Sequence, residues 1–244
     1  MLFRSRDVVT WVAPAGSKCL VGDMTGYTGD MNYEISGFTF NCRPEAATTY
    51  GAGVMIYRAT NGPLTLSIHD NRFIEDRASG DGSHWATSIF ACHNRYAERD
   101  GLGDAPVLIY NNIDETWGGM TMSNTRAFDI YGNTFDGCSD AIYNGHGCPD
   151  SDPTLFFGDH HIYDNIFMNA SDDLHSSTTP ALDWQYYGAG VGTHLPSIIE
   201  DNTFEDNDAA VRFVMDADMT YPAHEISGNS FINNGMAVDR KSVV

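Results

Sequence analysis

Basic residues are scarce in this chain of 244 residues, which has 13 lysines and arginines against 33 aspartates and glutamates and a formal net charge of −20 at pH 7. Nucleic acids and anionic membranes are bound through basic surfaces, so this balance argues against both as partners. Long apolar runs are also missing, since no stretch approaches the roughly 18 residues of a membrane-spanning helix. We therefore expect no membrane insertion.

Cysteines are few, and none has the paired spacing of metal ligands. The five cysteines exclude both a zinc site and a dense disulfide framework, and a bridge between Cys138 and Cys148 is left open. Aromatic residues make up 12% and hydrophobic residues 42% of the chain, too many for a disordered protein. The acidic residues are therefore expected to form the solvated shell of a folded domain.

The two ends of the chain look foreign to the rest. The opening MLFRS and the closing DRKSVV match translated sequencing adapters. Such segments are excluded from fold reasoning. We expect the natural sequence to run from residue 6 to residue 238 as one domain truncated at both ends, with residues 1–5 and 239–244 as non-native scars.

A short repeat, Ile-x-x-Asn-x-Phe, recurs along the chain. Its copies carry an asparagine at Asn71, Asn111, Asn133, Asn165, Asn202 and Asn229, and a further copy has Phe38 in that place. The apolar residue two positions later is Phe73, Ile113, Phe135, Phe167, Phe204 or Phe231. Nine residues after most of the asparagines comes Met120, Ile142, Leu174, Val211 or Val238. Fixed segments that alternate with loops of variable length are typical of a solenoid.

The repeat has a simple physical interpretation as strand, turn and strand. The first apolar residue and the phenylalanine point inward, and asparagine at the turn tolerates a left-handed backbone. Stacked coils lie about 4.8 Å apart, so the asparagines are expected to form a ladder and the phenylalanines a stack. No helical periodicity is sustained, which argues against alternating strands and helices.

Copies such as IYGNTFDGCSDAIY resemble the repeats of the pectate-lyase-like superfamily. The resemblance covers about residues 7–238 and implies an all-β fold, a single-stranded right-handed parallel β-helix, in an extracellular or cell-surface protein. It does not specify the activity, because this fold carries polysaccharide lyases, glycoside hydrolases and non-enzymatic surface proteins.

The resemblance also implies where a substrate would lie, in a groove outside the strands that follow the repeat. Alternation along those strands predicts an outward row of Thr121, Tyr143, His175 and Arg212, with Asp173 on the same face. We predict Arg212, His175, Tyr143 and Asp173 as catalytic residues. Arginine would neutralise a uronate carboxylate while histidine or tyrosine exchanges protons with the sugar. The alternative is a purely structural row in which Arg212 pairs with Asp173 or Asp208.

Loops beside this row supply further candidates. Trp184, Tyr186 and Tyr187 are predicted to stack on sugar rings, or else to cover the helix surface. Asp150, Asp152 and Asp159 are candidate calcium ligands, and calcium would be the one cofactor. Paired carboxylates at Asp172 and Asp173 would suit a glycoside hydrolase. These observations predict a protein that acts on or binds a polysaccharide, with a lyase as the sharper hypothesis and a non-catalytic adhesin or tailspike-like module as the alternative.

Overall fold

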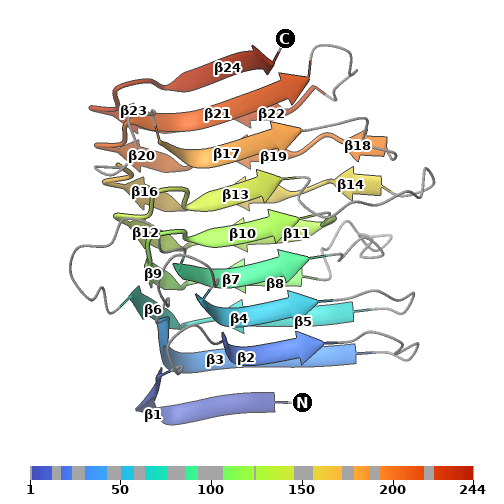
Figure 1. The fold of residues 1–244 in the computed structure, drawn as a ribbon, viewed down its shortest axis with the longest axis vertical. Coiled ribbons are helices and arrows are strands. Elements are labelled where there is room, and N and C mark those ends of the chain that lie inside the picture. The colour runs from blue at the N-terminus through green and yellow to red at the C-terminus, as the bar shows by residue number, and fades with distance from the viewer. Residues whose placement is uncertain are drawn as a thin grey trace.

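The computed structural model describes residues 2–12, 18–23, 31–42, 51–57, 64–75, 86–92, 107–123, 125–145, 156–171, 179–186, 193–216 and 223–243. All of the regular elements in these ranges are β-strands. Figure 1 shows them stacked as successive coils, with the N-terminus at one end of the stack and the C-terminus at the other. In the described ranges, no helix is long and apolar enough to cross a membrane.

One wall of the stack is an eight-stranded sheet in which every pairing is parallel. Its strands follow each other in chain order and come from successive coils. They are β2 (Lys18–Asp23), β4 (Gly51–Tyr57), β7 (Ala86–Cys92), β10 (Met120–Ser123), β13 (Ile142–Gly145), β17 (Pro180–Tyr186), β21 (Ala209–Asp216) and β24 (Val238–Val243). The strand of this sheet that follows Asn71 is β7, and its Ile89 is buried in the core.

The other walls form one larger sheet that bends at β3 (Met31–Cys42), which pairs with two later strands and with β1 (Leu2–Val12). We call its two halves the first and second arms. The first arm contains β5 (Leu64–His69), β8 (Val107–Tyr110), β11 (Phe128–Tyr131), β15 (His161–Tyr163), β19 (Ile198–Glu200) and β22 (Glu225–Ser227). The second arm contains β6 (Arg72–Glu75), β9 (Ile113–Glu115), β12 (Thr134–Asp136), β16 (Ile166–Met168), β20 (Thr203–Glu205) and β23 (Ser230–Ile232).

The prediction of a parallel β-helix is confirmed. From β5 onward each coil contributes one strand to each wall, and the coils stack through parallel pairing. A small separate sheet pairs β14 (Phe156–Gly158) with β18 (Thr193–Leu195). The pairing extends from Leu2 in β1 to Val243 in β24. The expectation that the natural sequence runs from residue 6 to residue 238 stays a prediction.

A ladder of asparagines, all buried except the half-buried Asn229, joins the two arms at the first turn. At each interior step, the backbone N–H and the side-chain amide of one asparagine donate to the side-chain oxygen of the next, at 2.9–3.1 Å. The same amide also donates to carbonyl oxygens of the previous coil and of its own coil. The ladder members are Asn71, Asn112, Asn133, Asn165, Asn202 and Asn229.

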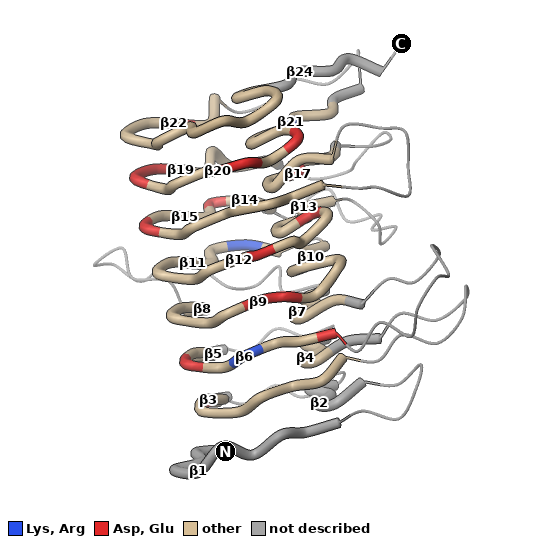
Figure 2. The backbone as a smooth tube through the Cα atoms, turned by 90° about the vertical axis from the view of Figure 1, so that its left-hand side faces the viewer, with Lys and Arg blue, Asp and Glu red and all other residues tan. Residues whose placement is uncertain are grey.

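One predicted ladder residue was wrong. Asn112 is the buried member of its coil, whereas Asn111 is exposed and has a φ of 54°. The left-handed position precedes the ladder asparagine in every copy, at Asp70, Asn111, Gly132, Asp164, Asp201 and Gly228. Aspartate, asparagine and glycine tolerate that backbone, so the turn and the ladder are two neighbouring sites rather than one. Several of the exposed turns carry the acidic residues that Figure 2 shows in red.

A second, shorter ladder lies five residues further on and was not predicted. Asn207 donates to the side-chain oxygen of Asn234, and its own oxygen accepts from the backbone N–H of Ala170. The residues before this position again have positive φ, at Gly137, Asn169, Asp206 and Asn233. Asparagine at both ends of a short strand thus closes two turns in one coil.

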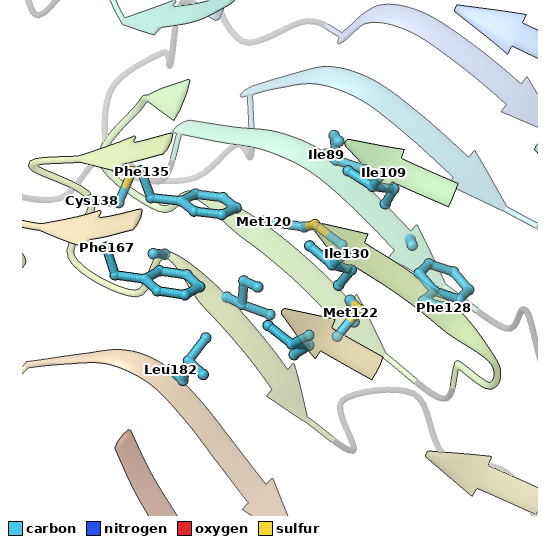
Figure 3. Packing of buried hydrophobic residues seen from close by; sticks show 14 of the residues in the cluster. Ile89, Ile109, Met120, Met122, Phe128, Ile130, Phe135, Cys138, Phe167 and Leu182 are labelled. Carbon is cyan, nitrogen blue, oxygen red and sulfur yellow. The ribbon is translucent and has the colours of Figure 1, made fainter. Parts of the chain in front are cut away.

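The core is filled by the inward side chains of all three walls (Figure 3). Phe135, Phe167, Phe204 and Phe231 stack with ring centroids 4.9–5.3 Å apart, as predicted. Phe40 and Phe73 form a separate stacked pair at 5.2 Å. The stack is interrupted between Phe73 and Phe135.

Asp114 fills that interruption. It pairs in register with both Phe73 and Phe135, and it is 2% exposed, whereas Ile113 is 46% exposed and does not point inward as predicted. Its carboxylate accepts hydrogen bonds from the backbone N–H and the hydroxyl of Thr116, at 3.0 and 2.7 Å. Burial raises the pKa of Asp114 to about 6, although hydrogen bonds from Ser88 and Thr116 act in the opposite direction. A carboxyl group therefore sits where the repeat places an aromatic ring.

Cys42 and Cys138 are both buried, and Cys138 is a free thiol. Cys138 donates to the carbonyl oxygen of Asp114 at 3.5 Å. Burial raises the pKa of the Cys138 thiol well above its ordinary value, and the neighbouring Asp114 adds to the effect. Cys148 lies outside the described residues.

Candidate functional site

The outward row of the eight-stranded sheet is only partly the row that the sequence predicts. Leu182, not Leu174, pairs with Ile142 and Val211, because the loop after β16 is longer than a nine-residue spacing allows. The row therefore continues from Thr121 through Tyr143 and Asp183 to Arg212. Asp183 occupies the place predicted for His175. His175 itself, Asp173 and Asp172 lie outside the described residues.

Arg212 and Asp183 form a two-pronged ion pair across neighbouring strands. The Nε and Nη2 atoms of Arg212 donate to the two carboxylate oxygens of Asp183 at 3.0 and 2.6 Å. The side chain of Asp183 is 0% exposed and that of Arg212 is 14% exposed. The two parallel hydrogen bonds hold both side chains in fixed positions. Removing either partner would leave the other charge buried and uncompensated. The structural alternative predicted Asp173 or Asp208 as the partner of Arg212, whereas the structure pairs Arg212 with Asp183.

Gln185 extends this pair to Tyr143. Its amide nitrogen donates to the carboxylate of Asp183, and its amide oxygen accepts from the hydroxyl of Tyr143 at 3.2 Å. The four side chains come from β13, β17 and β21, so one hydrogen-bonded chain spans three coils. We call this set the outer network: Tyr143, Asp183, Gln185 and Arg212.

Gly145 makes room for the tyrosine of the outer network. A Cβ atom at Gly145 would lie 2.4–2.5 Å from ring and hydroxyl atoms of Tyr143. The ring therefore lies directly against the Gly145 backbone. Glycine has no Cβ and so permits this close approach. Gly145, two positions after Tyr143 in β13, thereby lets the Tyr143 hydroxyl reach Gln185.

Of the three aromatic residues predicted to contact sugar rings, Trp184 is the one whose side chain the structure describes. Trp184 is 1% exposed and belongs to the core, with its ring centroid 6.2 Å from that of Phe213 and 6.1 Å from that of His224. The prediction for Trp184 was wrong. Alternation along β17 turns Leu182 and Trp184 inward, and it turns Asp183, which lies between them, outward. Tyr186 ends β17, with its side chain outside the described set, and Tyr187 lies wholly outside the described residues.

A row of stacked rings on the outer face of the first arm was not predicted. His69, Tyr110, Tyr131 and Tyr163 follow one another in successive coils with centroids 4.6–5.0 Å apart and planes within 9°. Burial, together with neighbouring Tyr110 and Asp129, raises the pKa of Tyr131. The sequence signal was available, since an aromatic residue stands two positions before three of the buried asparagines. The rings face one another, so they stabilise the stack rather than offer open faces to a ligand.

No group of three or more potential metal ligands occurs within the described ranges. Asp159 lies at a turn with a φ of 57°, while Asp150 and Asp152 lie outside those ranges. The residues that the structure describes therefore do not provide a calcium cage.

A scan against protein-family models and searches of the curated proteins and of the solved structures find no match. The parallel β-helix is established by the strand pairing itself.

Proposed function

We propose that this protein binds an extracellular polysaccharide on the outer face of the eight-stranded sheet. The observation that supports the proposal is the outer network, in which a phenol on β13 and a guanidinium on β21 are held in fixed positions on either side of β17. Membership of the pectate-lyase-like superfamily, with right-handed coils, is part of the same proposal. It is supported by the parallel β-helix and the Ile-x-x-Asn-x-Phe repeat.

Each member of the network has a distinct role in the proposal. Arg212 provides a local positive charge on a chain whose net charge is −20, so it is the group that would contact the carboxylate of a uronate sugar. Asp183 accepts two of its five N–H groups and orients the rest of the guanidinium. Tyr143 offers a hydroxyl that Gln185 orients.

A lyase is the enzymatic form of this proposal. In β-elimination, a base removes the proton next to the uronate carboxylate, and the glycosidic oxygen leaves with a proton. Arg212 would stabilise the negative charge that develops on the carboxylate, and Tyr143 would exchange the proton with the sugar. The predicted roles of His175 and Asp173 remain predictions, because both residues lie outside the described ranges.

A non-catalytic surface module is the second candidate, and the same ion pair favours it. A carboxylate that is 0% exposed and paired with arginine fastens β17 to β21 without any ligand. Under this alternative, the outer network stabilises the sheet and takes no part in binding.

Two matched pairs of variants separate these functions. Arg72 forms a two-pronged but more exposed pair with Glu115 on the second arm, at 2.8 and 3.0 Å, so Arg72→Ala controls for the loss of one arginine away from the proposed site. Tyr131→Phe on the first arm controls for Tyr143→Phe. Binding to a panel of uronate-containing glycans should fall about tenfold or more in the Arg212 and Tyr143 variants only. Formation of unsaturated uronate products would identify the lyase. Equal binding by folded wild-type, Arg212→Ala and Tyr143→Phe proteins would refute the proposed site.

A further inference from the structure

The hydrogen bonds of the outer network have a fixed direction that begins at Asp183. Its carboxylate oxygens act as acceptors, and the Nε and Nη2 atoms of Arg212 donate to both of them. The Asp183 side chain is 0% exposed, so water does not reach it to take the place of a protein partner. Any further side chain that hydrogen-bonds to Asp183 must therefore be a donor.

Gln185 passes this direction on to Tyr143. The amide nitrogen is the one donor group of the Gln185 side chain, so the nitrogen must face Asp183 and the amide oxygen must face Tyr143. An amide oxygen accepts and does not donate, so the hydroxyl of Tyr143 must give its proton to this bond, which is 3.2 Å long. A phenol has a single proton. When a ligand group meets the Tyr143 oxygen, that oxygen can therefore only accept.

The donor and the acceptor of the network lie close together on the sheet. Arg212 and Tyr143 both lean toward β17, where they contact Asp183 and Gln185, and these two residues are separated by roughly 7 Å along the strand. The side chains of Arg212, Tyr143 and Gln185 are half-buried, so a ligand on the outer face can reach them. One short ligand can thus meet a donor at Arg212 and an acceptor at Tyr143.

We propose that the outer network selects an acidic glycan with a free hydroxyl close to its carboxylate, and discriminates against the same glycan acylated at that hydroxyl. This inference rests on the proposed polysaccharide site and names the substrate class that the site takes. The carboxylate accepts from Arg212, and the sugar hydroxyl donates to Tyr143. An O-acyl group has no proton to donate, so its oxygen and the phenol oxygen would meet as two acceptors. Asp183 and Gln185 act as positioning residues, because they set the direction of the Tyr143 hydroxyl.

Uronate oligosaccharides prepared in two forms, with free hydroxyls and after chemical O-acetylation, test this selection. Wild-type protein should bind the free form about three- to tenfold more tightly in calorimetric titrations. Tyr143→Phe should bind the two forms with nearly equal affinity, because it lacks the accepting oxygen. Tyr131→Phe, which removes a phenol from the first arm, should keep the preference of wild type. Simple steric rejection of the acetyl group would instead persist in Tyr143→Phe.

Gln185→Lys tests the direction of the network itself. A lysine ammonium group has three donors and no acceptor, so it can donate to Asp183 and to the Tyr143 oxygen. The phenol proton is then turned toward the ligand, and the preference should shift toward the acetylated form, which offers a carbonyl acceptor. Gln185→Leu leaves the phenol free to rotate and should abolish the preference. The ratio of the two affinities is the quantity compared, since it is independent of a general change in charge, and circular dichroism checks that each variant is folded.

Each failure has a separate meaning. Equal affinity of wild-type protein for the two forms would overturn this inference and leave the proposed polysaccharide site in place. A preference that is unchanged in Tyr143→Phe, or in the folded Gln185 variants, would also overturn it. Absence of binding to every uronate oligosaccharide in both forms would refute the proposed function, and this inference with it.

Discussion

Replacing Asp114 with asparagine should stabilise the β-helix at neutral pH and change its stability little at pH 3. The carboxyl group lies inside the coil between the phenylalanine positions of β6 and β12, where water is excluded. Burial disfavours the charged form, and the pKa of Asp114 rises from 3.8 to about 6. A group with a raised pKa contributes stability that is complete below pH 3.8 and is lost as the pH rises through about 6.

The size of the effect follows from that shift. A rise of roughly two pKa units corresponds to about 3 kcal/mol of differential interaction between the protonated and ionised forms. This amount is the penalty carried by wild-type protein at pH 7. Asparagine at position 114 keeps an oxygen that accepts from Thr116 but does not ionise, so the penalty disappears.

Urea unfolding followed by circular dichroism at several pH values between 3 and 7 measures this difference. The variant should gain stability over wild type progressively between pH 4 and pH 7. Asp164→Asn removes one charge at an exposed turn and so reports the effect of reducing long-range repulsion in an acidic chain. The reasoning fails if the difference between Asp114→Asn and wild type is the same at pH 4 and pH 7, or if the Asp164 control matches it.

Two further predictions concern buried groups. Asn112→Ala should lower the free energy of unfolding by about 3 kcal/mol or more, because it removes a buried amide with contacts to two coils. The adjacent Asn111→Ala should lower it by only about 1 kcal/mol. Equal losses in thermal or urea unfolding would contradict the assigned ladder. Burial lowers the pKa of His224 from 6.5 to about 4, so its contribution to stability is present above pH 6.5 and is lost as the pH falls through about 4. Wild-type protein should lose unfolding free energy on the order of 3 kcal/mol through His224 between pH 6.5 and pH 4, and His224→Phe should remove this loss. An unchanged pH dependence of the unfolding free energy in the variant would disprove this assignment.

Sequence periodicity predicted the wrong register in the coil whose core position is occupied by the polar residue Asp114. The repeat requires an apolar residue two positions after the asparagine, which favoured Asn111 followed by Ile113. The alternative register, Ile109 to Asn112, places Asp114 inside. Only Thr116 among its hydrogen-bonding partners is local, while Ser88 comes from a different coil and cannot be placed beside Asp114 from the sequence.

Loop length was the second source of error. An apolar residue at Leu174 satisfies the nine-residue spacing, yet Leu182 is the one that pairs with Val211. Loops of a solenoid vary in length at little energetic cost, so spacing alone does not identify the next strand. Because the strand is centred on Leu182 and not on Leu174, Asp183 pairs with Arg212, Gln185 joins the same network, and the Trp184 side chain points into the core.

The sequence by itself determined the parallel β-helix, most of the asparagine ladder and the phenylalanine stack, because each depends on a local pattern that every coil repeats. The tertiary structure alone decided which residues from different coils meet. The partner of Arg212, the orientation of Tyr143 and the burial of Asp114 depend on the register between strands that lie roughly 20 to 40 residues apart along the chain but, as neighbouring strands, only about 4.8 Å apart in space. That register is set by the stacking of whole coils and cannot be read from any one of them.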